Sequence, residues 1–143
     1  MKNRIKIGIV GTGGMANAHA RDILRNRHVK LVAVADVMED KARAFAAQHE
    51  VPQVFTSQTE LLAKAEVDAI VNVTPDAFHA SLTLESLAAG KHVLCEKPLA
   101  THASDARKMA AMAKKKGVVN MVNFSYRNSA AIQRAHTLVQ RGD

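Results

Sequence analysis

The feature that most constrains the fold is a glycine-rich turn that directly follows the first apolar run of the chain. Large apolar side chains alternate over residues 5–10, which is typical of a short buried strand. The run ends in Gly11-x-Gly13-x-x-Ala16, a fit to the dinucleotide-binding pattern G-x-G-x-x-G/A. Gly11 permits the tight turn, Gly13 lets a pyrophosphate approach the backbone, and Ala16 lets the next helix pack on the strand. The first turn of that helix would direct its free N–H groups at the phosphates.

A plain strand-to-helix turn is the alternative interpretation, because glycine-rich turns are common. An acid about 20 residues beyond the motif favours the dinucleotide interpretation. Asp36 fills that place, at the end of a second apolar run over residues 30–35. Its carboxylate would accept hydrogen bonds from the adenosine ribose and repel the 2′-phosphate of NADP. Asp36 therefore predicts NAD in preference to NADP, and Lys41 and Arg43 on the next helix are the residues that would weaken this preference.

The composition indicates a single soluble globular domain. The 143 residues are 48% hydrophobic and 23% charged, which suits one domain with a sizeable core. No apolar run is long enough to span a membrane, and we expect no signal peptide at residues 1–4. The single cysteine, Cys95, excludes a disulfide framework and indicates a reducing cytoplasm. We expect Cys95 to be a small buried strand residue rather than a nucleophile.

The net charge of +7 raises the question of nucleic-acid binding. The main basic cluster, residues 114–116, precedes Gly117, which is typical of a helix C-terminus. Aromatic residues make up only 3% of the chain, which argues against recognition by base stacking. We therefore expect no nucleic-acid partner.

Strand and helix patterns alternate along the whole chain. The predicted strands span residues 5–10, 30–35, 53–55, 68–73, 92–95 and 118–124. The predicted helices span residues 14–27, 39–49, 57–64, 77–89, 103–116 and 130–140, with Ser57 as an expected N-cap. Alternation of this kind predicts an α/β fold, a doubly wound and mostly parallel Rossmann sheet with helices on both faces. Residues 1–124 would form its core and residues 125–143 its last helix.

Polar or special residues interrupt the apolar pattern where the predicted strands end. They are Gly11 and Gly13, Asp36, Thr74 and Pro75, Glu96 to Pro98, and Tyr126 with Arg127. The carboxyl ends of parallel strands share one edge, and ligands bind there. The sequence therefore predicts one site at that edge. His19 is expected to be a surface or cap-region residue, and no metal site is predicted, because no second ligand lies at metal spacing.

Four segments together resemble a known family: residues 8–16, residues 74–79, residues 89–100 and the Tyr126-Arg127 pair. Over all 143 residues the chain resembles the amino-terminal half of the Gfo/Idh/MocA family, the glucose–fructose oxidoreductase and inositol dehydrogenase group. The most specific element is Gly-Lys-His-Val-x-x-Glu-Lys-Pro in the third segment. The resemblance implies NAD(P)-dependent hydride transfer on sugars, cyclitols and related polyols.

The resemblance also implies roles for single residues. Lys97 would be catalytic, meeting the substrate hydroxyl and helping to move its proton, and Glu96 would contact the ribose on the nicotinamide side. Pro98 would shape the turn, often through a cis bond. Because a nearby carboxylate favours the charged amine, we expect Lys97 to act as a donor and relay rather than as the sole base.

The expected cofactor-binding residues are Gly11, Thr12, Gly13, Gly14, Met15, Asp36, Thr74, Pro75, His79, Glu96, Lys97 and Arg127. Two of these assignments have an equally simple local alternative. His79 matches a histidine of the family's Thr-Pro-x-x-x-His segment, or packs under a loop at a helix start. Arg127 approaches the nicotinamide side, or ties the last strand to the last helix.

The family's second domain, an α+β unit that supplies most of the substrate pocket, is absent from these 143 residues. We therefore expect the isolated chain to bind a dinucleotide and to have little or no activity. We also expect a homo-oligomer that associates through the last helix or last strand, because exposed apolar surface favours association. The alternatives are a non-catalytic dinucleotide-binding or redox-sensing module, or a site for another nucleotide such as S-adenosylmethionine. The Glu96-Lys97-Pro98 element disfavours both, since neither needs a lysine there.

Overall fold

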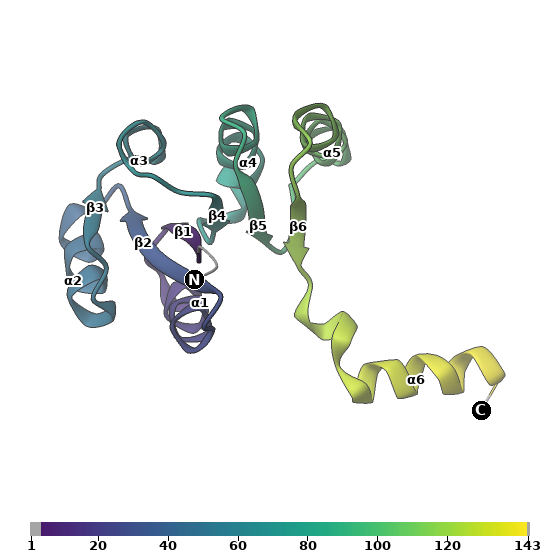
Figure 1. Cartoon of the computed structure of the whole chain (residues 1–143). Coiled ribbons are helices and arrows are strands. Elements are labelled where there is room, and N and C mark those ends of the chain that lie inside the picture. Colours follow the sequence, from purple (N-terminus) through teal and green to yellow (C-terminus); the bar gives the residue numbers. More distant parts are fainter. Residues whose placement is uncertain (1–3, 143) are drawn as a thin grey trace.

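Six parallel strands form one sheet in the order β3-β2-β1-β4-β5-β6 (Figure 1). The strands are β1 (Ile5–Val10), β2 (Val29–Ala35), β3 (Gln53–Phe55), β4 (Ala69–Asn72), β5 (His92–Glu96) and β6 (Asn120–Asn123). This computed structural model describes residues 4–142. The expectation about a signal peptide concerned residues 1–4, and three of these lie outside the described part. From β1 the chain builds outward to β3, then crosses back to β4 and builds outward the other way. The predicted doubly wound α/β fold is confirmed.

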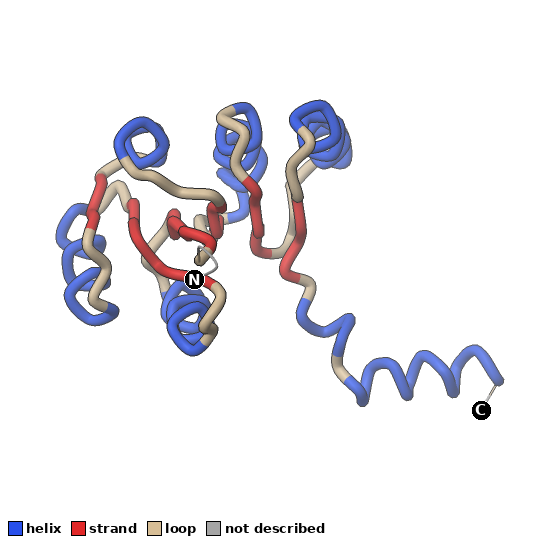
Figure 2. The backbone as a smooth tube through the Cα atoms, in the orientation of Figure 1, coloured by secondary structure: helices blue, strands red, loops and turns tan. Residues whose placement is uncertain are grey.

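Helices cover both faces of this sheet. The helices of the chain are α1 (Gly14–Arg25), α2 (Glu39–His49), α3 (Gln58–Lys64), α4 (His79–Ala88), α5 (Ala103–Lys116) and α6 (Ala130–Arg141), with short 3₁₀ helices η1 (Asp76–Phe78) and η2 (Ser125–Asn128). Helices α1 and α2 lie on one face, and α3, α4 and α5 lie on the other (Figures 1 and 2). None of the described helices is long and apolar enough to cross a membrane.

Apolar side chains fill the space between the sheet and the helices. On the α1 side, Ile9 of β1 packs in one cluster with Ala16 and with Phe45 of α2, all buried. Ala16 is 0% exposed, as expected for the small residue at which the helix approaches the strand. On the other face, Leu61 of α3 packs with Ile70 of β4. Burial on both faces explains why the strands are almost continuously apolar.

Cys95 belongs to the third cluster, between β5 and the helices α4 and α5. Its side chain is fully buried beside Leu87 and Met109. Burial raises the pKa of the Cys95 thiol to about 11, since the charged thiolate would lose its hydration. The expectation of a small buried residue is confirmed, and the thiol is not activated as a nucleophile.

Helix boundaries differ from the prediction at two places. The helix expected from residue 77 opens as η1, where the Phe78 N–H bonds to the carbonyl oxygen of Pro75, and becomes α-helical only at His79. The first helix ends at Arg25 instead of residue 27. Asn26 is already extended there, and its side-chain oxygen accepts a bond of 2.9 Å from the N–H of residue 28. Such a local side-chain bond competes with the helix.

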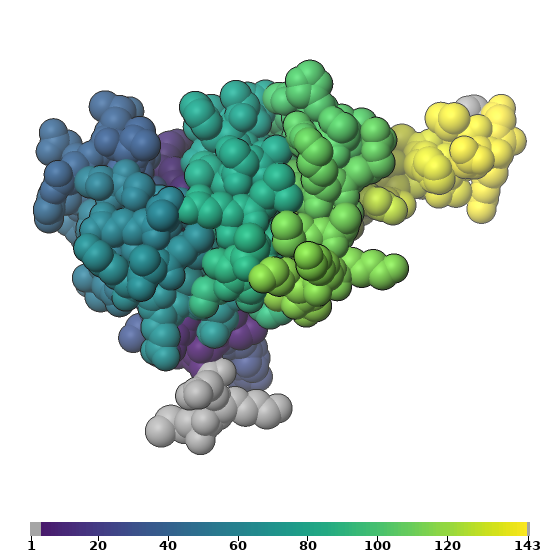
Figure 3. Space-filling view, turned by 90° about the horizontal axis from the view of Figure 1, so that it is seen from above, coloured from purple at the N-terminus to yellow at the C-terminus, as the bar shows by residue number. Residues whose placement is uncertain are grey.

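The last helix extends away from the sheet (Figures 1 and 3). Helix α6 packs against η2, and none of its residues is buried. Gly142 is the C-cap of α6 and has a left-handed φ of 83°, while residue 143 lies outside the described part. The expectation that residues 125–143 lead to a further domain stays a prediction.

Candidate functional site

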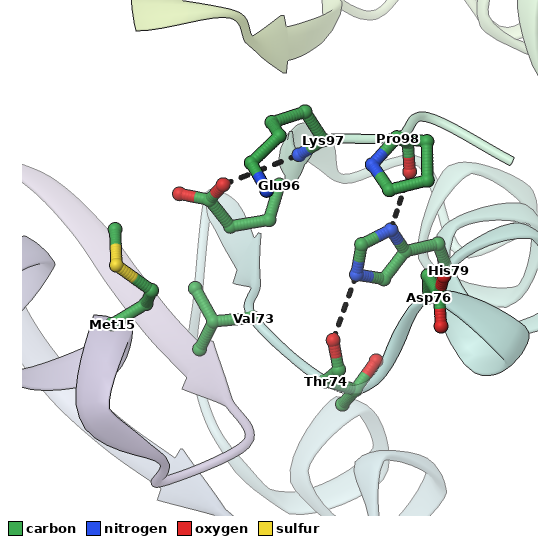
Figure 4. A pocket seen from close by; sticks show the side chains of 8 residues that line it. All are labelled: Met15, Val73, Thr74, Asp76, His79, Glu96, Lys97 and Pro98. Atoms are coloured by element: carbon green, nitrogen blue, oxygen red, sulfur yellow. Dashed lines mark hydrogen bonds between the residues drawn. The ribbon is translucent and has the colours of Figure 1, made fainter.

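A cavity of about 290 Å³ opens at the carboxyl edge of the sheet (Figure 4). Its lining residues are Met15, Val73, Thr74, Asp76, His79, Glu96, Lys97 and Pro98. They come from the start of α1, the loop after β4 and the turn after β5. The structure therefore brings together five of the predicted site residues, namely Met15, Thr74, His79, Glu96 and Lys97.

The glycine turn lies beside this cavity, between β1 and α1. Gly11 has φ +92°, and a Cβ there would lie 2.9 Å from the carbonyl oxygen of Val73, so a larger residue would be strained and would collide. At Gly13 and Gly14 an added Cβ would meet no atom within 4 Å. The start of α1 has no side-chain cap and no acidic residue. The Ala16 N–H bonds to the Gly13 carbonyl oxygen, and no side chain caps this end of the helix, an arrangement that suits a bound anion.

Asp36 at the end of β2 is tied to this turn. Its Oδ2 accepts bonds from the Thr12 backbone N–H (2.8 Å) and from the Thr12 hydroxyl (2.6 Å). Its Oδ1 accepts a bond of 2.9 Å from the Met38 N–H. Burial raises the pKa of Asp36, but these bonds and the charge of Lys41 outweigh burial and hold the pKa below its usual range. A negative charge is thus held next to the glycine turn.

Glu96 at the end of β5 is the most heavily bonded acid at the cavity. Its Oε1 accepts bonds from His19 Nε2 (2.8 Å) and Asn123 Nδ2 (2.7 Å), and its Oε2 accepts one from the Lys97 N–H (3.2 Å). Burial raises the pKa of Glu96, but the hydrogen bonds from Asn123, His19 and Lys97 lower it by more, so the net shift is downward. Glu96 is therefore a carboxylate, and the ring nitrogen of His19 is the donor.

The prediction that His19 is a surface or cap-region residue was wrong, because it lies inside α1 with a largely buried side chain. Its side chain is 12% exposed and pairs with Glu96, 77 positions away in sequence. Sequence reasoning also missed Asn123, the other donor to Glu96. One signal was present for His19: it follows Met15 by four residues, so both lie on the same face of α1, the face at the cavity.

His79 joins the two loops that frame the cavity. Its ring is buried, with Nδ1 2.6 Å from the Pro98 carbonyl oxygen and Nε2 2.7 Å from the Thr74 carbonyl oxygen (Figure 4). Buried Asn72 holds the same loop, because its Oδ1 accepts a bond of 2.7 Å from the Thr74 hydroxyl. Packing under the loop thus describes the place of His79, and a direct cofactor contact stays a prediction. Pro75, next to Thr74, is exposed and does not line the cavity.

Lys97 and Arg127 occupy different positions relative to the cavity. Lys97 is exposed and lines the cavity, and its backbone N–H donates the bond of 3.2 Å to Glu96 Oε2 (Figure 4). The peptide between Lys97 and Pro98 is cis. Arg127 is exposed on η2 and does not line the cavity, and its carbonyl oxygen accepts a bond from the Gln133 side chain. Its expected approach to the nicotinamide side therefore stays a prediction.

No group of three or more His, Cys, Asp and Glu side chains within residues 4–142 is arranged to hold a metal ion. The chemistry available at the cavity is that of a carboxylate, an exposed amine and backbone N–H groups.

A wholly parallel sheet with a glycine turn between β1 and α1, and an acid after β2, defines a Rossmann domain of the dinucleotide-binding class. Residues 5–124 match the family described as "Oxidoreductase family, NAD-binding Rossmann fold". The chain belongs to this family, Gfo/Idh/MocA, and the resemblance seen in the sequence is confirmed.

The following similar proteins are much longer than this chain. An inositol 2-dehydrogenase from Rubrobacter xylanophilus is 43% identical over 107 residues, covering 74% of this chain and 30% of that protein. A D-glucoside 3-dehydrogenase from Escherichia coli is 32% identical over 139 residues, which cover 96% of this chain and 40% of that protein. Among solved structures, the WlbA dehydrogenase from Bordetella pertussis in complex with NADH and UDP-GlcNAcA has a TM-score of 0.90 at 29% identity, covering 98% and 43%. The chain spans less than half the length of these proteins.

Proposed function

We propose that this chain is the NAD(H)-binding half of an oxidoreductase. The enzyme would transfer a hydride between the nicotinamide and a CH–OH group of a sugar, cyclitol or related polyol. The observation that carries the proposal is the convergence of Thr74, Glu96 and Lys97 on one cavity beside the glycine turn. Support comes from relatives named as inositol and glucoside dehydrogenases and from the NADH of the WlbA complex.

The glycine turn is the proposed pyrophosphate site. The open space at Gly13 and Gly14 leaves the backbone accessible, and the uncapped start of α1 offers N–H groups to a doubly charged diphosphate. Gly11, Thr12 and Met15 complete this part of the site. Thr74 and His79 would contact the ligand from the β4 side, with exposed Pro75 beside them outside the cavity itself. The Thr74 hydroxyl bonds to Asn72, and the His79 ring contacts the Thr74 carbonyl oxygen, which holds this loop in place.

Asp36 supports NAD in preference to NADP. Its carboxylate stands next to the turn and would repel a 2′-phosphate, as a carboxylate does at this position of the fold. Arg43 is paired with Glu39 at 2.5 Å on the exposed side of α2, and the charge of Lys41 lowers the pKa of Asp36. These two cations are the residues that would weaken the preference for NAD.

The proposed chemistry uses the Glu96-Lys97 pair. Bound NAD supplies a nicotinamide ring that accepts the hydride from the alcohol carbon. The hydroxyl proton must leave at the same time, and Lys97 would carry it to solvent, since its amine is exposed at the rim. In the reverse direction Lys97 would donate that proton to the carbonyl oxygen. Glu96 would accept a hydrogen bond from the ribose on the nicotinamide side, and Arg127 would approach the same side from η2.

Calorimetric titration of the purified chain with NADH and, separately, with NADPH tests the cofactor part of this proposal. NADH should bind clearly more tightly than NADPH. Equal affinities would remove the role of Asp36, and binding of neither would overturn the dinucleotide site.

A turnover assay of the full-length protein tests the role of Lys97. Lys97→Ala should abolish turnover and retain NADH binding, whereas Lys115→Ala, an exposed lysine of α5, should leave both unchanged. Unchanged turnover of Lys97→Ala would overturn the assignment. NADH binding without turnover by the unaltered protein on any sugar or polyol would favour the redox-sensing alternative, in which Lys97 has no role.

The proposed setting is the cytoplasm, and the proposed assembly is a homo-oligomer. The one cysteine is a free buried thiol, which fits a reducing compartment.

Ile132 and Val139 of α6 are 51% and 72% exposed, and Met121 of β6 is 56% exposed. A second hollow of about 620 Å³ lies beside Met121, on the sheet face next to α1. Apolar surface of this extent favours association, so light scattering should show a dimer or larger species, and a strict monomer at high concentration would contradict the proposal.

A further inference from the structure

The Glu96 carboxylate accepts hydrogen bonds from side chains of two other elements. His19 reaches it from α1, and Asn123 reaches it from the end of β6. Both donors bond to the same oxygen, Oε1, at 2.8 and 2.7 Å. Glu96 is 7% exposed and His19 is 12% exposed at its side chain, so water competes little for these bonds.

The two oxygens of Glu96 therefore differ in what they still offer. Oε1 has two short charge-assisted bonds, whereas Oε2 has a single longer bond of 3.2 Å from the Lys97 N–H. Glu96 lines the cavity, and its carboxylate extends there between Met15 and Lys97 (Figure 4). A carboxylate oxygen accepts more than one hydrogen bond, so Oε2 retains the capacity to bind a hydroxyl group in the cavity.

The donors lie on elements that also frame the rest of the site. His19 follows the first turn of α1 by about one helical turn, and that first turn is the proposed pyrophosphate site. One rigid helix would thus contact the phosphates directly and the nicotinamide half through Glu96. Asn123 ends β6, whose pairing with β5 places residue 123 directly opposite Glu96.

We propose that His19 and Asn123 are positioning residues that hold Oε1 of Glu96 and so present Oε2 to the ribose hydroxyls on the nicotinamide side. This inference rests on the proposed NAD(H) site and adds to it the two residues that set the geometry of its acid. A merely structural His19 would instead contribute to the stability of α1 and affect all parts of a bound dinucleotide equally.

The test is calorimetric titration of the chain with NADH and with ADP, which carries the adenosine and both phosphates but no nicotinamide ribose. His19→Ala should weaken NADH binding about tenfold, the loss expected for one bond to a charged group. ADP binding should change less than about twofold, because ADP does not reach Glu96. His19→Gln, which keeps an N–H donor near the Nε2 position, should recover most of the NADH affinity.

Three comparisons make the outcome decisive. Asn123→Ala should reproduce the selective loss of NADH affinity, and it carries the test together with His19→Gln if His19→Ala does not fold. His28→Ala, which changes an exposed histidine in the turn between α1 and β2, should bind both ligands as the unaltered chain does. Equal weakening of NADH and ADP, or no weakening, would overturn the inference. Failure of the unaltered chain to bind either ligand would instead overturn the proposed function.

Discussion

Thr12 holds Asp36 by two hydrogen bonds to a single carboxylate oxygen, one from its backbone N–H (2.8 Å) and one from its hydroxyl (2.6 Å). Thr12, which lies between the two motif glycines, thus fixes the position of Asp36, the acid that follows β2. A carboxylate fixed before the ligand arrives loses less side-chain entropy on binding than a free one. Thr12 therefore contributes to the proposed choice of NAD indirectly, through the orientation of Asp36.

Replacement of this hydroxyl should weaken the cofactor preference. Thr12→Val keeps the shape of the side chain and the backbone bond but removes the 2.6 Å hydroxyl donor. We expect the ratio of NADPH to NADH dissociation constants to fall about threefold to tenfold, as one bond to a charged group is lost. Titration with both cofactors measures this ratio. Thr12→Ser is the matched control and should keep the ratio, and an unchanged ratio in Thr12→Val would contradict the positioning role.

Substitution of the two motif glycines should affect stability differently, because only Gly11 is needed for the fold of the turn. Gly11→Ala adds a Cβ 2.9 Å from the Val73 carbonyl oxygen at φ +92° and should lower the free energy of unfolding by about 2 kcal/mol or more. Gly13→Ala adds its Cβ to open space and should change stability by less than about 0.5 kcal/mol. Urea denaturation of both variants measures these differences.

The same Gly13→Ala variant should bind NADH at least about tenfold more weakly, because the added methyl group stands where the pyrophosphate would approach. Calorimetry on the folded variant measures this loss. Unaltered NADH affinity in Gly13→Ala would show that the ligand does not use this turn.

His79 should be a stabilising residue out of proportion to its size. His79→Phe retains an aromatic ring but removes the two ring nitrogens that lie 2.6 Å from the Pro98 carbonyl oxygen and 2.7 Å from the Thr74 carbonyl oxygen. We expect the free energy of unfolding to fall by about 2 kcal/mol, the cost of an unsatisfied buried acceptor. His136→Phe on exposed α6 is the matched control and should change it by less than about 0.5 kcal/mol. Equal effects of the two substitutions would argue against a stabilising role of the contacts between His79 and the two carbonyl groups.

Glu96 should stabilise the fold only while it is ionised. Its pKa is lower in the folded chain than in the unfolded chain, so its contribution is present above the unfolded pKa and is lost as the pH falls through the folded pKa. The difference in unfolding free energy between the unaltered chain and Glu96→Gln should therefore shrink between about pH 5 and pH 3. Urea denaturation at several pH values measures it, and a constant difference over this range would contradict the buried charge network.

Local signals in the sequence were sufficient for the elements of the fold. The glycine turn, the capping serine and the C-terminal glycine at residue 117 all appear where they were expected, because each acts on backbone within a few positions. Ser57 accepts the predicted bond from the Glu60 N–H at 3.1 Å, and Gly117 has the left-handed φ of 67°. Strand periodicity predicted the sheet for the same reason. The edge at which the polar residues gather also followed, since parallel strands must end on the same side.

The contacts within the site depended on the tertiary structure. His19 pairs with Glu96 across 77 positions, and its own neighbours in the sequence carry no sign of that partner. His79 lies between two carbonyl groups, and Thr12 supports Asp36, only because packing brings β1, β2, β4 and β5 together. The sequence by itself determined the fold class and the edge of the sheet where the site lies, because those depend on local backbone preferences and apolar periodicity. It also indicated the family, through the resemblance of four short motif segments. Only the tertiary structure decided which side chain holds which, because a hydrogen bond requires donor and acceptor within about 3 Å and with suitable direction, and that distance is set by the packing of elements far apart in the chain.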